Sequence, residues 1–451
     1  MSQYASWIWW LIVSLGILVT FHEFGHYWVA RRCGVRVLRF SVGFGRPILR
    51  RVGRDGTEYV VGWIPLGGYV RMLDEREGEV PDALLPQAFN RKSVYQRIAV
   101  VAAGPLFNLF LCIALLWAMF VIGKDDFLPL VGQSRGVAAE AGLRPDDRIL
   151  AVDGQRMDTW THVQMALATA AIDQRPISLE VLRGSGDGAT LRLDLASLAE
   201  TPKPATVLRE IGLVPRQFLL PPDVGGVAAD SAAARAGLEP GDRLLRIGSR
   251  DLRSWDEISA AVQLQAQPDS PLAVVYERDG SRRETEIRPE YAADADPPRW
   301  LLGVSAPQVE VKHDALLRYG PLGAVGAALD ETWRLTGATL GILWRMVRGA
   351  VSLENINGPI SIAQYASASA QLGLAWFLSF LAMLSLSLCI MNLLPIPILD
   401  GGHLLYYLIE MVKGSPVSER TMIAGQFVGM LLLVSLMGLA FYNDILHLVS
   451  T

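Results

Sequence analysis

The sequence predicts a multi-domain α-helical membrane protein with four transmembrane helices, two tandem α+β domains and a β-hairpin element. Four long stretches are apolar and almost free of charged residues, and each is long enough to cross a bilayer. A pattern at 141–150 recurs at 236–245, which is typical of a tandem duplication. Between the first two apolar stretches, an Asp-Gly turn signal joins two strand-like runs. These three observations together predict the architecture.

The composition limits the possible functions. The chain has 451 residues, enough for several domains, and 51% of them are hydrophobic. Its formal net charge is -4, and it has no basic tract with interleaved aromatic residues, so nucleic-acid binding is not expected. The cysteines Cys33, Cys112 and Cys389 are far apart in the sequence, which predicts neither a disulfide framework nor a C-x-x-C metal site.

The first transmembrane helix is expected within residues 1–30. Residues 1–21 carry no charge, and the tryptophans at 7, 9 and 10 are typical of an interfacial belt. A signal peptide would begin with basic residues, but the first basic residue comes after the span, so we expect a retained helix. Its C-terminal end is expected to face the cytoplasm, because basic residues follow it directly: Arg31, Arg32, Arg36 and Arg39.

The end of this helix carries an H-E-x-x-H pentad, His22-Glu23-Phe24-Gly25-His26. On a helix, His22 and His26 share a face, so both imidazoles can hold one metal ion. Glu23 lies beside them, where it can take a proton from a metal-bound water. The alternative is two ordinary helix histidines with a buried glutamate between them. Three ionisable groups at the end of an apolar span are costly, which favours the metal site.

Residues 31–97 are expected to form a cytoplasmic β-hairpin region. The strand-like runs 48–52 and 57–64 flank the turn signal Asp55-Gly56, and Gly67 and Gly68 interrupt the second run. One interpretation is an ordinary cytoplasmic hairpin. The other is a β-element beside the metal, with an open edge to which an extended substrate segment adds as a strand. The sequence alone leaves both interpretations open.

The second transmembrane helix is expected at 98–122, with basic residues just before it. Gly104 would allow close approach of a neighbouring helix. Asn108 lies in the middle of the span, where it either bonds to another helix or reaches the metal site.

Two repeats follow, at 127–215 and 220–309. Their shared pattern begins at Ala141 and at Ala236, and the same register pairs Trp160 with Trp255. Each copy continues into a helical segment and then a hairpin, at 177–193 and at 272–287. The pattern resembles bacterial PDZ domains, which bind peptides by strand addition. On that resemblance the carboxylate-binding loops are expected near Val131, Gly132, Gly225 and Gly226. Alternatively, the repeats act only as steric filters.

The last part of the chain contains two more spans. Residues 310–370 are expected to form an amphipathic helical region, because charged residues are spread through their apolar stretch. The third span is expected within 371–403, and the fourth at 421–443. Asp400 follows an apolar run and two prolines; it is either a turn residue or a third metal ligand. We interpret His403 as an interfacial histidine rather than a fourth ligand, because a catalytic metal needs an open position.

The topology tests this assembly. Asp400 and the pentad reach one metal only if the third helix runs from the outside inwards. The second helix then runs outwards, and residues 123–370 lie outside. The basic segments 31–97 and 411–420 agree, because they fall on the cytoplasmic side.

These residues together resemble the site-2 protease family of intramembrane zinc metalloproteases, in the branch of the regulator-of-sigma-E protease. The likeness covers essentially the whole chain. It rests on the pentad in a first membrane helix, the two PDZ-like repeats, and the segment Asn392-Leu393-Leu394-Pro395-Ile396-Pro397-Ile398-Leu399-Asp400-Gly401.

The resemblance implies one Zn²⁺ ion bound by His22, His26 and Asp400, with Glu23 as the catalytic base. It also implies that the hairpin at about 40–72 is membrane-associated. The substrate-binding residues expected on this basis are Asn392, Pro395, Pro397, Gly67 and Gly68.

The resemblance further implies a bacterial inner-membrane protein with periplasmic PDZ domains and an active site toward the cytoplasmic side of the bilayer. Its expected substrates are single-span membrane proteins of the anti-sigma factor type, already cut once in the periplasm, and remnant signal peptides. The PDZ pair would exclude uncut substrates by size.

Two other classes of protein compete with this interpretation. A catalytically inactive PDZ-bearing membrane scaffold would not need the complete set of ligands and base that the chain carries. A divalent-metal transporter would need several intramembrane acids along a path, and the first, second and fourth spans offer almost none.

Overall fold

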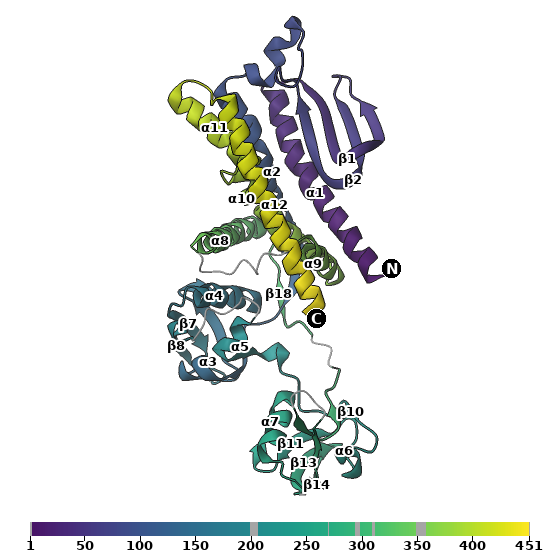
Figure 1. Cartoon of the computed structure of the whole chain (residues 1–451). Coiled ribbons are helices and arrows are strands. Elements are labelled where there is room, and N and C mark those ends of the chain that lie inside the picture. Colours follow the sequence, from purple (N-terminus) through teal and green to yellow (C-terminus); the bar gives the residue numbers. More distant parts are fainter. Residues whose placement is uncertain are drawn as a thin grey trace. The chain divides into compact units, whose positions relative to one another are not determined.

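The computed structural model describes residues 2–198, 206–268, 270–293, 298–308, 312–348 and 358–450. The chain divides into two compact units (Figure 1). The helical unit comprises Met1–Lys124 and Leu317–Thr451, and the repeat unit comprises Asp125–Leu316. Each unit is described by itself.

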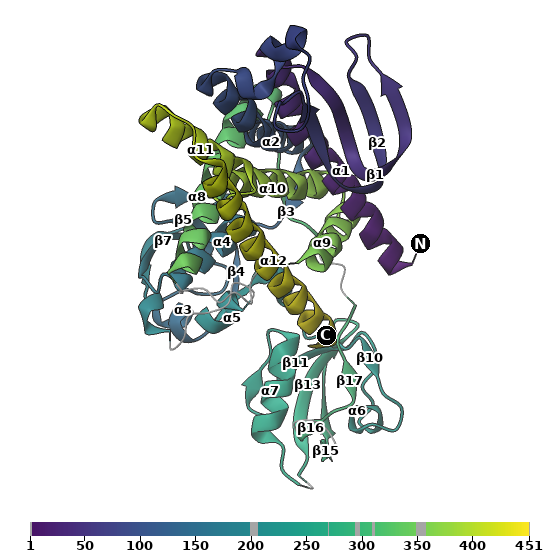
Figure 2. The same cartoon turned by 45° about the horizontal axis from the view of Figure 1, so that its top comes forward.

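Four helices of the helical unit are long and apolar enough to cross a membrane, in agreement with the four predicted spans. They are α1 (Gln3–Arg32), α2 (Val94–Ile122), α10 (Leu374–Leu393) and α12 (Glu419–Ser450). Helices α1 and α10 both pack against α2 (Figure 2). Ser93 caps the N-terminus of α2 in a capping box. Its hydroxyl oxygen accepts a hydrogen bond from the Gln96 backbone amide, and the Gln96 side-chain oxygen accepts one from the Ser93 backbone amide.

The predicted hairpin is larger than its sequence signals indicate. It consists of β1 (Val37–Val52) and β2 (Glu58–Met72), joined by the predicted Asp-Gly turn. Residues 39–42 of β1 lie between the two halves of β2 and pair with 58–61 on one side and with 68–71 on the other. The bend that separates these halves occurs at Gly67, whose positive φ of 115° suits glycine. Among the described residues, 68–71 pair with a strand on one side only, so this segment is an edge.

Three further helices complete the helical unit: α8 (Pro321–Val347), α9 (Pro359–Gln371) and α11 (Asp400–Lys413). Helix α8 is not among the four candidate spans, as its charged residues predicted. Ala324, Ala328 and Thr332 are buried at helical spacing, so one stripe of α8 packs into the unit. Asp444 in α12 accepts the backbone amide of Ile360 at 2.8 Å and so caps α9.

The predicted third membrane segment, 371–403, is not one continuous helix. Helix α10 stops at Leu393, and residues 394–399 are irregular before α11 begins at Asp400. Pro395 and Pro397 cannot supply backbone amides to a continuing helix, which explains the break. Asp400 is therefore the first residue of a separate helix and not the end of the spanning one.

The repeat unit contains two copies of one arrangement. The first repeat comprises β4 (Val131–Ser134), α3 (Gly136–Glu140), β5 (Arg148–Val152), β6 (Gln155–Arg156), α4 (Trp160–Ile172), β7 (Ile177–Leu182), β8 (Gly188–Leu193), α5 (Val207–Ile211) and β9 (Leu213–Pro215). The second comprises β10 (Gly226–Val227), α6 (Ala232–Arg235), β11 (Arg243–Ile247), β12 (Arg250–Asp251), α7 (Trp255–Gln265), β13 (Leu272–Arg278), β14 (Ser281–Ile287), β15 (Glu290–Ala292), β16 (Arg299–Leu301) and β17 (Val304–Ser305). The sheet orders are β6-β5-β7-β8 and β12-β11-β13-β14, so both predicted hairpins are present.

A buried ion pair occurs at equivalent places in the two repeats. Asp147 lies 2.6 Å from Arg183, and Asp242 lies 2.6 Å from Arg278. Both carboxylates are about 1% exposed. Burial acts to raise the pKa of Asp242, but hydrogen bonds from Arg278 and a backbone amide outweigh it and hold that pKa below its ordinary value. The arginine partners were not recognised from the sequence, because they lie outside the repeated pattern.

Candidate metal centre

Three residues from distant parts of the chain converge in the helical unit. Nε2 of His22 lies 3.2 Å from Nε2 of His26. Oδ2 of Asp400 lies 3.2 Å from the former atom and 3.4 Å from the latter. The imidazoles come from the predicted helical face of α1, and the carboxylate comes from the first residue of α11. The structure thus brings together the three residues that the sequence analysis proposed as ligands.

The geometry of these atoms fits a bound metal ion. Two nitrogens and one oxygen about 2.0–2.1 Å from a tetrahedral Zn²⁺ stand about 3.3–3.4 Å apart, close to the separations observed. Oδ2 of Asp400 is buried and has no hydrogen-bond donor among the described residues. A buried carboxylate oxygen between two imidazole nitrogens is costly unless a cation lies between them. Three protein ligands also leave the fourth coordination position open, as in catalytic zinc sites.

Helix α2 orients both imidazoles. Nδ1 of His26 lies 2.8 Å from the carbonyl oxygen of Val100, so Nδ1–H donates and Nε2 keeps its lone pair for a metal. Nδ1 of His22 lies 3.1 Å from the side-chain amide of Asn108. A metal at Nε2 of His22 would leave the proton on Nδ1, which needs a hydrogen-bond acceptor. We therefore assign the Asn108 amide with its oxygen toward Nδ1, so that Nδ1–H donates to Oδ1.

A glycine makes this contact between helices possible. A Cβ atom on Gly104 would lie 2.3 Å from Nε2 of His26 and 2.8 Å from Cε1 of His22. On the other side, a Cβ on Gly25 would lie 2.5 Å from the carbonyl oxygen of Ala103. The close helix approach predicted for Gly104 is therefore present, and it occurs directly at the candidate ligands.

Glu23 lies at a cavity that reaches the same centre. The cavity has a volume of about 800 Å³, and its lining includes Glu23, His26 and Asp400. Val70 and Met72 of β2 also line it, so the edge segment of the hairpin borders the cavity. A Cβ on Gly68 would lie 3.1 Å from Cγ of Glu23. The geometry thus matches the interpretation in which an open β-edge lies beside the metal.

The remaining expected site residues lie outside the candidate ligand group. Asn392 lies in the last full turn of α10, and Pro395 and Pro397 lie in the irregular segment before Asp400. His403 lines the cavity but is not part of the candidate ligand group.

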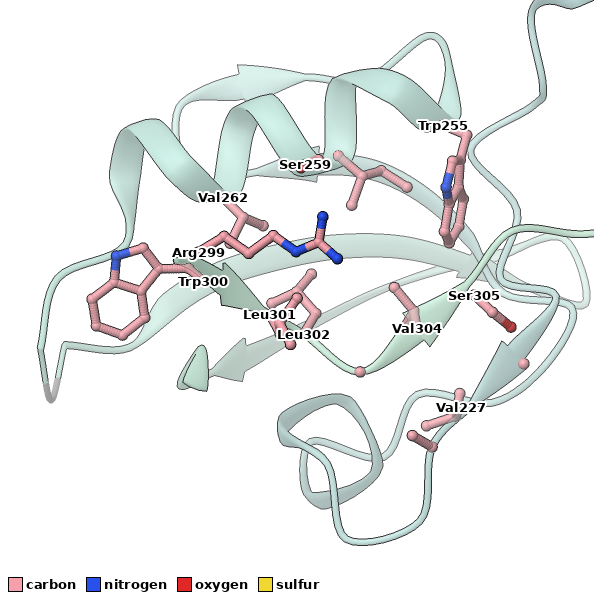
Figure 3. A pocket seen from close by; sticks show the side chains of 14 residues that line it. Val227, Trp255, Ser259, Val262, Arg299, Trp300, Leu301, Leu302, Val304 and Ser305 are labelled. Atoms are coloured by element: carbon pink, nitrogen blue, oxygen red, sulfur yellow. The ribbon is translucent and has the colours of Figure 1, made fainter. Parts of the chain in front are cut away.

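The second repeat contains a separate groove of about 610 Å³ (Figure 3). Helix α7 forms one wall through Trp255, Ser259 and Val262, and residues 299–305 form the other. Figure 3 shows the Arg299 side chain extending into the groove between these walls. This arginine was not singled out from the sequence, because nothing local distinguishes it from a surface residue.

The segments expected to form carboxylate-binding loops have different surroundings in the two repeats. In the first repeat, the Val131 amide donates to the backbone carbonyl of Asp147, and the Val131 carbonyl accepts from the backbone amide of Asp146. Both backbone groups of Val131 are therefore already bonded. A Cβ on Gly132 would lie 2.7 Å from Cα of Arg216, so this side of the glycine packs against the chain. In the second repeat, the Gly225 amide donates to Ser305 at 2.9 Å. Of these residues, Gly226 lines the groove.

The chain is similar to known proteins over almost its whole length. Residues 10–436 match peptidase family M50. A protein of Xylella fastidiosa (strain Temecula1), provisionally named a zinc metalloprotease, is 48% identical over 447 residues, which are 99% of this chain and 100% of the relative. The regulator of sigma-E protease RseP of Escherichia coli K12 is 41% identical over 437 residues, covering 96% and 97% of the two chains. Protease RseP of Yersinia pestis is 40% identical over 438 residues, with 96% and 97% covered.

The family match and the names of the relatives agree with the structure, which has three converging candidate ligands and four helices long and apolar enough to cross a membrane. The chain belongs to peptidase family M50, the site-2 proteases, and it is an intramembrane zinc metalloprotease.

Proposed function

We propose that His22, His26 and Asp400 hold the zinc ion and that Glu23 is the catalytic base. The observation that carries this proposal is the convergence of two imidazole nitrogens and one carboxylate oxygen within 4.8 Å of one another, from α1 and α11. When bound, zinc supplies a Lewis acid that polarises the scissile carbonyl and lowers the pKa of water. Glu23 takes a proton from the attacking water at its carboxylate and passes it to the leaving amine.

The edge of the hairpin is the proposed site of substrate binding. A membrane helix bonds its own backbone internally, so the scissile bond becomes accessible only after local unwinding. Residues 68–71 offer an edge to which an unwound segment adds as a strand, and Glu23 lies beside that edge. Gly67 and Gly68 carry no side chain where this edge begins, so a substrate segment can approach the backbone closely there. Asn392, Pro395 and Pro397 are proposed to contact the same segment near Asp400.

The substrates proposed are single-span membrane proteins of the anti-sigma factor type and remnant signal peptides. Support comes from the relatives in Escherichia coli and Salmonella typhimurium, whose names describe regulators of sigma-E. We propose a bacterial inner-membrane location with the pentad toward the cytoplasm, because basic residues follow α1 and precede α2. The repeat unit then lies in the periplasm.

The two repeats are proposed to be PDZ domains. The same order of strands, with a helix between the first and second strand pairs, supports a common fold for both. The groove of the second repeat lies between α7 and β17, where a peptide can add to the strand. If a substrate peptide binds in this groove, the second repeat selects substrates by binding; if none binds, the repeats select by size alone.

Cleavage by the purified protein tests the proposed roles. A single-span substrate shortened to its periplasmic stub is incubated with the native chain and with Glu23→Gln, and bound zinc is measured in both. We expect Glu23→Gln to retain zinc and to lose cleavage by at least about a hundredfold, since general acid–base catalysis contributes about 10²–10⁴ in rate. Cleavage by Glu23→Gln at the native rate would show that Glu23 is not the catalytic base. Bound zinc is also measured in Asp400→Ala, and a native zinc content in that variant would show that Asp400 is not a ligand.

A further inference from the structure

One face of helix α11 extends from the candidate metal centre to a half-buried ion pair. Asp400 begins the helix, and Tyr407 follows two turns later on the same face. Glu410 lies one turn further, about 15 Å along the axis from Asp400. Tyr407 is 7% exposed, so this face is packed against the rest of the helical unit.

Arg97 of α2 holds the far end of this face. Its Nη2 donates to Oε1 of Glu410 at 2.6 Å, and the two side chains are 13% and 17% exposed. The guanidinium also lies over the Tyr407 ring, 4.8 Å from its centroid. A second bond, from Nε of Arg97 to the Lys92 carbonyl at 3.2 Å, fixes the orientation of the guanidinium. Two contacts of Arg97, with Glu410 and Tyr407, thus define where the end of α11 lies on α2.

The same face of α2 also orients the two histidines. Arg97, Val100, Gly104 and Asn108 follow one another at intervals of three and four residues, which places them along one stripe of the helix. Val100 and Asn108 bond to the imidazoles, and Gly104 packs against them. The stripe therefore positions ligands from α1 and, through Arg97, the helix that carries the third ligand.

We propose that Arg97 and Glu410 are positioning residues that set the orientation of α11 and thereby bring the Asp400 carboxylate to the metal. This inference rests on the proposed ligand set. The start of α11 is fixed separately, since a Cβ on Gly401 would lie 2.1 Å from the Leu394 carbonyl and a Cβ on Gly402 would lie 2.5 Å from the Ile396 carbonyl. These close contacts hold the first turn of α11, and the Arg97–Glu410 pair holds its far end.

A purely structural role predicts a different result. If the pair only stabilises the packing of α11, its loss lowers the unfolding temperature and leaves the zinc affinity of the folded protein unchanged. If the pair positions Asp400, the zinc affinity falls even where the protein remains folded. Partners of this kind around a metal site change its affinity by about 10–100-fold, and we expect about tenfold for a residue that acts through a helix.

The test measures zinc affinity by competition with a chelator on the full chain in micelles. The variants are Arg97→Met, which keeps an apolar stem beside Tyr407, Glu410→Gln, and the exchange of Arg97→Glu with Glu410→Arg. Absorption spectra with Co²⁺ in place of zinc report the ligand geometry independently of activity. Arg91→Met is the matched control, because Arg91 pairs with Glu75 at 2.6 Å on the exposed surface before α2.

We expect both single variants to bind zinc about tenfold more weakly and to change the cobalt spectrum. The exchanged pair should recover most of the affinity, and Arg91→Met should match the native chain. Native zinc affinity in folded Arg97→Met or Glu410→Gln overturns the inference. If Arg97→Met does not fold, the same criterion applies to Glu410→Gln, which keeps the size of the side chain. Failure of the native chain to bind zinc would instead contradict the proposed function.

Discussion

Asn108 holds His22 from the middle of α2: its side-chain amide lies 3.1 Å from Nδ1 of the imidazole, and the residue is completely buried. A hydrogen bond of this kind fixes the tautomer of a metal-binding histidine and the plane of its ring. The sequence left open whether this intramembrane asparagine bonds to another helix or belongs to the site. Its position assigns it to the surroundings of a candidate ligand.

Replacing Asn108 should weaken metal binding without removing a ligand. We expect Asn108→Ala to bind zinc about 10–100-fold more weakly, because Nδ1 of His22 loses its partner. The measurement is competition with a chelator, followed by cleavage at saturating zinc. Ser385→Ala is the control, since its hydroxyl donates to the Asn108 backbone carbonyl at 2.7 Å and not to the amide. Equal zinc affinity in Asn108→Ala and the native chain would show that His22 is held by other contacts.

Adding one methyl group at Gly104 should disrupt the same centre. A Cβ there would lie 2.3 Å from Nε2 of His26, far inside van der Waals contact, so the imidazole has to move. We expect Gly104→Ala to lose most bound zinc, as measured by elemental analysis of the purified protein. The matched control is Gly16→Ala on α1, where nothing lies within 4 Å of the added carbon. Native zinc content in Gly104→Ala would mean that α1 and α2 move apart enough to fit the added methyl group with little loss of free energy.

The buried Asp242–Arg278 pair should make the stability of the second repeat depend on pH. The pKa of Asp242 is lowered in the folded chain, because hydrogen bonds from Arg278 and the Glu239 amide outweigh the effect of burial. The unfolded chain therefore binds the proton at higher pH than the folded chain does. The stabilisation is fully present above the ordinary value of 3.8 and is lost as the pH falls through the folded pKa.

Asp242→Asn should remove most of this dependence and lower the unfolding free energy of the repeat by roughly 1–3 kcal/mol, since Arg278 loses a charged partner. Unfolding of the full chain is followed by hydrogen exchange of the β11 and β13 amides from about pH 7 down to about pH 2, so that the range extends well below the ordinary pKa of an aspartate. Asp279→Asn removes a carboxylate from the hairpin turn of the same repeat, where the positive φ of 52° suits asparagine. An equal response of both variants would contradict a specific role for the buried pair.

Local patterns accounted for most of the secondary structure. Length and low charge predicted the four spans, and turn residues with strand-forming runs predicted the hairpins of both repeats. The hairpin beside the pentad was recognised only in part. Its strand-like runs gave 48–52 and 57–64, whereas residues 39–42 also pair with 68–71. Such double pairing depends on contacts between segments separated in sequence, which periodicity does not report.

Asp400, the third candidate ligand, shows the same difference between local sequence patterns and tertiary contacts. The sequence singled out Asp400 as an acid after an apolar run, and only the fold places its Oδ2 atom 3.2 Å from His22. The break after Leu393, caused by prolines, moves Asp400 onto its own helix, and the direction of that helix is set by packing. The Val100 carbonyl that orients His26 carries no signal in the sequence, because every residue has such a group.

The sequence by itself determined the membrane spans, the duplication, and the identity of His22, Glu23 and His26, because these depend on hydropathy, repetition and helical spacing over short distances. Tertiary structure alone placed Oδ2 of Asp400 beside the two imidazoles, made residues 68–71 an edge beside Glu23, and paired Arg97 with Glu410. These features depend on how helices and strands pack across hundreds of residues. Each such contact is a property of the three-dimensional arrangement and not of any local pattern.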